Sequence, residues 1–129
     1  MTTSLTEFLL ARIAEDEAIA RDVVAGPWIH ARDERSVLDA VAHRATAPGT
    51  PQATNLHVHR WGPGRVLAEV AAKRRIVQHA LDIQLGADEI DWAVVDDLDD
   101  PQVRAMAVAL LAIALPYADN PDYRAEWRP

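Results

Sequence analysis

The feature that most constrains the fold is an unbroken apolar run, Ala105–Leu115, inside a predicted helix that begins at Pro101. Asp100 followed by Pro101 is the pattern of a helix N-cap with proline at the first helical position, where its missing N–H does no harm. After Arg104 no polar residue follows before the run stops at Pro116, so the helix predicted over 101–115 is apolar on every side. Such a helix is either the central element of a bundle or partly covered by another chain.

Length and composition narrow the class of protein further. The run is 11 residues long, well below the roughly 18 that suggest a membrane span. The N-terminus lacks the layout of a signal peptide, and the chain has no cysteine, which suits a reducing cytoplasm. A net charge of -7 disfavours binding to nucleic acid or to an anionic membrane. We expect one soluble cytoplasmic domain without a cofactor.

Start and stop signals predict two more principal helices. Ser4-Leu5-Thr6-Glu7 is a capping box, and Gly26-Pro27 ends the helix that it starts, which predicts a helix over 5–25. Gly62-Pro63-Gly64 is a turn that leads into a second helix, and Gly86 stops it, which predicts a helix over 64–85.

The segment over 28–61 leaves alternatives open. Trp28–Arg32 is compatible with a short strand, Ser36–Ala45 with a short helix, and Thr46–Thr54 with a loop. Leu56–Trp61 alternates apolar and polar residues, which is a strand template, although six residues do not exclude a helical turn. The predicted fold class is therefore mainly α, a small domain with three principal helices. A short β-hairpin between the first and second would make it α+β.

Two further segments flank the apolar helix. Asp88–Asp100 is an acidic connector that has room for a short helix docked by Trp92. Residues 116–129 form an aromatic tail, predicted to pack on a helical domain over 1–115.

Three stretches resemble an uncharacterised family of small actinobacterial and phage proteins, a domain of unknown function. They are the first helix into Ala25-Gly26-Pro27-Trp28, the segment Arg65–Val77, and the end Ala114–Pro129. The resemblance implies one natural domain and brings no activity or ligand with it.

His57 and His59 are the sharpest candidates for chemistry. On a strand, residues i and i+2 face the same way, so two imidazoles can share a divalent metal ion. A third ligand has to come from elsewhere, and no spacing ties one to the pair. The candidates are His30, His43, His79, Glu69 or an acid of the connector. The competing interpretation is two surface histidines on an exposed segment.

The remaining clusters favour protein contacts over catalysis. Lys73-Arg74-Arg75 fans out around a helix and forms no single basic face, while Asp96–Asp100 lacks the pattern of a calcium loop. The tail combines aromatic residues with arginine, the residue types that dominate interfaces. They either cover the apolar helix or face a partner. Candidate interface residues on the helix and the tail are Leu110, Leu111, Tyr117, Tyr123 and Trp127.

We therefore expect a small non-catalytic accessory or regulatory protein that acts through protein contacts, with a homodimer over the apolar helix as one form of them. The alternative function is a metal-binding module, or a metal-dependent enzyme, built on His57 and His59.

Overall fold

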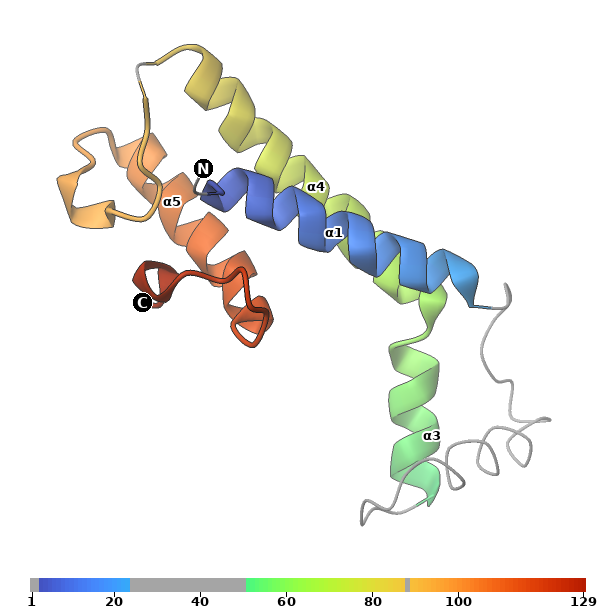
Figure 1. Ribbon diagram of the computed structural model, residues 1–129. Coiled ribbons are helices and arrows are strands. Elements are labelled where there is room, and N and C mark those ends of the chain that lie inside the picture. Colours follow the sequence, from blue (N-terminus) through green and yellow to red (C-terminus); the bar gives the residue numbers. More distant parts are fainter. Residues whose placement is uncertain (1–2, 24–50, 88) are drawn as a thin grey trace. The chain divides into compact units, whose positions relative to one another are not determined.

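A computed structural model describes residues 3–23, 51–87 and 89–129, and over these residues the protein is mainly helical, without a strand (Figure 1). This confirms the predicted fold class. None of the described helices is apolar over a length that would cross a bilayer. The α-helices are α1 (Leu5–Asp22), α3 (Pro51–Arg60), α4 (Pro63–Leu85) and α5 (Pro101–Ala114). Three short 3₁₀ helices follow α4, namely η1 (Val95–Asp97), η2 (Leu115–Tyr117) and η3 (Ala125–Trp127).

The helices α1 and α5 begin where their capping signals placed them, and α4 begins at Pro63, one residue before the predicted start. The Oγ of Ser4 accepts a hydrogen bond from the Glu7 amide at 3.2 Å, and the Glu7 carboxylate accepts one from the Ser4 amide at 3.2 Å. At α5, one carboxylate oxygen of Asp100 accepts from the amides of Gln102 and Val103 at 2.8 and 3.4 Å. These bonds satisfy N–H groups that have no partner inside the helix.

The strand predicted at Leu56–Trp61 is wrong, because these residues lie in α3 or, for Trp61, directly follow it. The predicted loop is also wrong from Pro51 on, because α3 begins there. Pro51, read as a loop signal, occupies the first position of this helix, where proline is tolerated. Trp61 continues the helical hydrogen-bond pattern, since its amide donates to the carbonyl of His57 at 2.9 Å. The strand expected at 28–32 and the helix expected at 36–45 lie outside the described residues.

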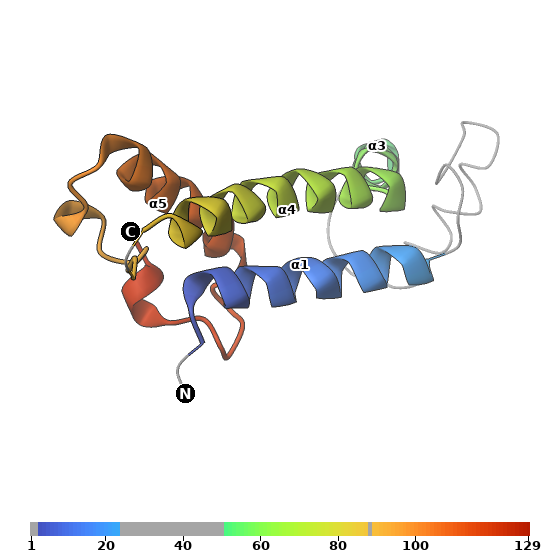
Figure 2. The same ribbon diagram turned by 90° about the horizontal axis from the view of Figure 1, so that it is seen from above.

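The chain divides into two compact units, and the first contains Met1–Glu15 and Val70–Pro129. Within this unit, α1 up to Glu15 and α4 from Val70 run side by side in opposite directions (Figures 1 and 2). Its core draws on every segment of the unit. Its largest fully buried side chains are Phe8, Leu9, Ile13, Val77, Leu110 and Trp127. The second unit contains Asp16–Glu69.

An aromatic cluster fixes the tail in the first unit. The rings of Phe8 and Trp127 have centroids 5.0 Å apart, and Trp127 is 1% exposed. Tyr123 meets both rings edge-on, at 5.9 Å from Phe8 and 5.5 Å from Trp127. Tyr117 meets Phe8 at 6.4 Å. Edge-on and tilted arrangements of this kind are favourable beyond the area that they bury.

The acidic connector is fixed by its tryptophan, as the sequence predicts. Trp92 is 3% exposed, and its indole Nε1 donates a hydrogen bond to Oε1 of Gln84 in α4 at 3.1 Å. The bond satisfies the polar atom of an otherwise apolar ring. The short helix that follows is the 3₁₀ helix η1.

We expect Leu110→Ala to destabilise the protein by about 2–5 kcal/mol, because the substitution leaves a cavity at a fully buried position. Leu85→Ala is the matched control. Leu85 is 87% exposed, so the same change there should stay within about 0.5 kcal/mol. Urea denaturation measures both free energies of unfolding, and equal losses would contradict the assigned core.

We expect Trp127→Ala to release the tail, with a loss of stability of about 3–5 kcal/mol. Arg124, which precedes η3, is half-buried and paired with Glu126, so trypsin should cleave after it slowly in the wild type and much faster in the variant. Mass spectrometry of a timed digest measures the rate. Trp61→Ala, which removes a half-exposed tryptophan of the second unit, should leave cleavage after Arg124 unchanged.

A candidate interaction groove along α5

The helix α5 has two apolar faces, one buried and one exposed. Ala107, Leu110, Leu111 and Ala114 point into the core of the first unit. On another side Val108, Ala112 and Leu115 form a row at the helical spacing i, i+4, i+7, in which Leu115 directly follows the helix. Val108 is 54% exposed and Leu115 is 41% exposed. The helix is thus buried on one face and leaves an apolar row in solvent on another.

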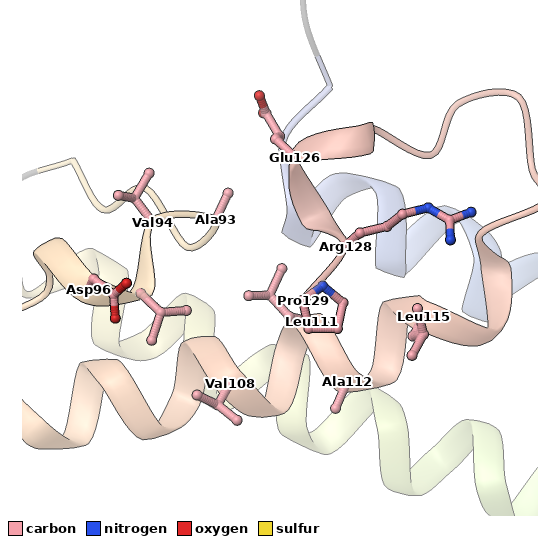
Figure 3. Close-up of a pocket in the computed structure, with 11 residues that line it drawn as sticks. Ala93, Val94, Asp96, Val108, Leu111, Ala112, Leu115, Glu126, Arg128 and Pro129 are labelled. Atoms are coloured by element: carbon pink, nitrogen blue, oxygen red, sulfur yellow. The ribbon is translucent and has the colours of Figure 1, made fainter.

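Two walls turn this row into a groove of about 460 Å³. Ala93–Asp96, from the connector and η1, form one wall. Glu126, Arg128 and Pro129, from the tail, form the other (Figure 3). Val108, Leu111, Ala112 and Leu115 lie along the floor. Concave apolar surfaces with a few polar groups at the rim are typical of binding sites.

Each wall is held by a buried tryptophan. Trp92 precedes the first wall directly and is bonded to Gln84. Trp127 lies within the second wall's segment and packs on Phe8. Because both rings are buried, the backbone next to each is anchored to the core, and the groove is formed before any partner arrives.

The charged groups of the groove lie in its two walls, Asp96 in the first and Arg128 in the second. Figure 3 shows Asp96 at one end of the row and the guanidinium group of Arg128 at the other. The third charged group, Glu126, is paired with Arg124 at 2.8 Å. Within the described part of the chain neither Asp96 nor Arg128 takes part in an ion pair.

The predicted interface residues lie mostly inside the unit. Leu110, Leu111 and Trp127 are buried, while Tyr117 and Tyr123 are half-buried. The row of Val108, Ala112 and Leu115 was not singled out from the sequence. No signal marks it, because every face of this helix is apolar and the pattern does not tell which one turns inward.

The histidine pair loses the geometry that suggested a metal site. His57 and His59 lie on α3, where residues two apart are separated by a rotation of about 200° around the helix axis and so point to nearly opposite sides. The ring of His57 instead lies 6.4 Å from that of Trp61. Among the described residues no group of three or more His, Asp or Glu side chains is placed to hold a metal ion. His30 and His43 lie outside the described residues.

Two of the basic side chains near the predicted cluster, Lys73 and Arg65, have partners nearby. Lys73 Nζ donates to the hydroxyl of Tyr117 at 3.3 Å. In the second unit the guanidinium of Arg65 lies 4.1 Å from the centre of the Trp61 ring and pairs with Glu69 at 3.3 Å. One face of the Trp61 indole is therefore covered by an arginine that is itself paired with a carboxylate.

Comparison with known proteins shows the family. A model of a family of unknown function, DUF6221, matches residues 2–129. No curated protein and no solved structure matches the chain. The match agrees with the resemblance to a domain of unknown function, and the origin in actinobacteria or their phages stays a prediction. Since the family model spans nearly the whole chain, the protein belongs to the family of unknown function DUF6221.

Proposed function

We propose that the protein is a non-catalytic accessory or regulatory protein that works by self-association, with the groove along α5 as its docking surface and a second copy as the occupant. The observation that carries the proposal is the exposed apolar row on a helix whose other side is in the core. Apolar side chains that face water have an unfavourable hydration free energy, and covering them with another apolar surface removes it.

The chemistry of the row suits packing of one helix against another. Ala112 sits between Val108 and Leu115, and its small side chain leaves room at the centre of the row for an apolar side chain of the second copy. Covering a valine or leucine completely gains about 1.5–3 kcal/mol, and these two side chains are about half exposed. Covering the row therefore contributes a few kcal/mol to association, and the surface is small compared with an obligate interface.

The charges favour a second copy over an unrelated apolar segment. The groove carries a carboxylate at one end and a guanidinium at the other. A surface with opposite charges at its two ends is complementary to itself after a half-turn. Because the apolar row is short, we expect a dissociation constant in the micromolar range, typical of interfaces below about 1,200 Å² of total buried area.

We expect Val108→Asp to raise the dissociation constant of the dimer at least about tenfold, because the dimer would bury an unpaired carboxylate. Sedimentation equilibrium measures the constant, and circular dichroism confirms that the variant is folded. Leu85→Asp adds the same charge in the same unit, at the end of α4. Leu85 is more exposed than Val108 and lies outside the groove, so this variant should dimerise like the wild type.

Two results would overturn the proposal. One is a wild type that stays monomeric up to about 1 mM, a concentration at which even weak specific pairs associate. The other is a dimer that Val108→Asp and Leu85→Asp weaken equally, since the effect would then come from net charge alone.

A further inference from the structure

The groove has a direction. Asp96, in η1, lies beside the N-terminal part of the apolar row, and Arg128, in the tail, lies beside its C-terminal part (Figure 3). Both residues are exposed, and neither has an ionic partner within the described chain. Glu126 does not cancel Arg128, because it is held by Arg124 at 2.8 Å.

In a two-fold symmetric dimer, the positions of Asp96 and Arg128 determine which charges meet. In a symmetric dimer the same patch is used by both copies, so that if residue i contacts residue j, residue j also contacts residue i. An axis that crosses the row near Ala112 sets the two α5 helices antiparallel and brings Asp96 of each copy opposite Arg128 of the other. An axis along the row would instead bring Asp96 against Asp96 and Arg128 against Arg128.

We infer that the second copy docks antiparallel, and that two Asp96–Arg128 pairs between the copies fix its orientation and its identity as a copy of this chain. This inference rests on the proposed self-association and adds the residues that determine its specificity. Antiparallel α5 helices also pair opposite ends of their dipoles. The two pairs also offset part of the repulsion between two chains that each carry a net charge of -7.

Salt is a poor test of this arrangement, since it screens the general repulsion and the two pairs together. Charge reversal separates them. Asp96→Arg and Arg128→Asp should each weaken self-association about five- to tenfold at low ionic strength, because each turns both pairs into repulsions. An equimolar mixture of the two variants should associate within about threefold of the wild type, since the mixed dimer again pairs opposite charges at both places.

The controls make the same charge changes outside the groove. Asp97→Arg alters the neighbour of Asp96 in η1, and Arg75→Asp alters an exposed arginine of α4. Their mixture should gain nothing over either control alone. Analytical ultracentrifugation of each protein and each mixture measures the constants, with circular dichroism as the check of folding.

The outcomes separate the two claims. If the wild type dimerises, each reversal alone leaves its constant unchanged, and the mixture associates more tightly than the wild type, the copies meet with like ends together and the antiparallel arrangement is overturned. If the wild type dimerises and neither the reversals nor their mixture change the constant, the charges do not direct docking and the inference falls while the proposed function stands. A monomeric wild type overturns both.

Discussion

The packing of Trp127 on Phe8 is the interaction on which the rest of the first unit depends. It joins the tail to the beginning of α1, with ring centroids 5.0 Å apart and the indole 1% exposed. Without it, η3 and the residues after it would have no anchor in the core. The same contact holds one wall of the groove beside α5, so stability and the proposed docking surface come from one packing event.

The helix α5, which has one buried and one exposed apolar face, links the fold to the proposed function. Leu110 and Ala114 of α5 are buried, while Val108 on another face of the same helix is half exposed. Keeping valine in water at that point does not stabilise a monomer, and the proposed dimer would cover it. The core thus positions the surface on which the proposed self-association depends, and the flanking charges would give it direction.

Local signals in the sequence predicted the three principal helices, because capping residues such as Ser4 and Asp100 act within a few residues of themselves. They failed at α3, where Pro51 starts a helix and an alternation of six residues resembled a strand. That error also removed the basis for the His57–His59 metal site. The groove could not be predicted, because the exposed face of α5 is as apolar as its buried face, and its walls come from irregular segments before and after the helix whose path local signals do not determine.

The most direct test of the central claim uses the absence of cysteine from the chain. Ala112→Cys places one thiol at the middle of the exposed row, next to the inferred axis, where the two copies of one residue come closest to each other. A disulfide forms there if their Cα atoms come within about 4.4–6.8 Å. Mild oxidation at micromolar concentration should give a covalent dimer, while Ala72→Cys, at an exposed alanine of α4, should stay monomeric. Equal cross-linking of the two variants, or none at position 112, would contradict self-association through this groove.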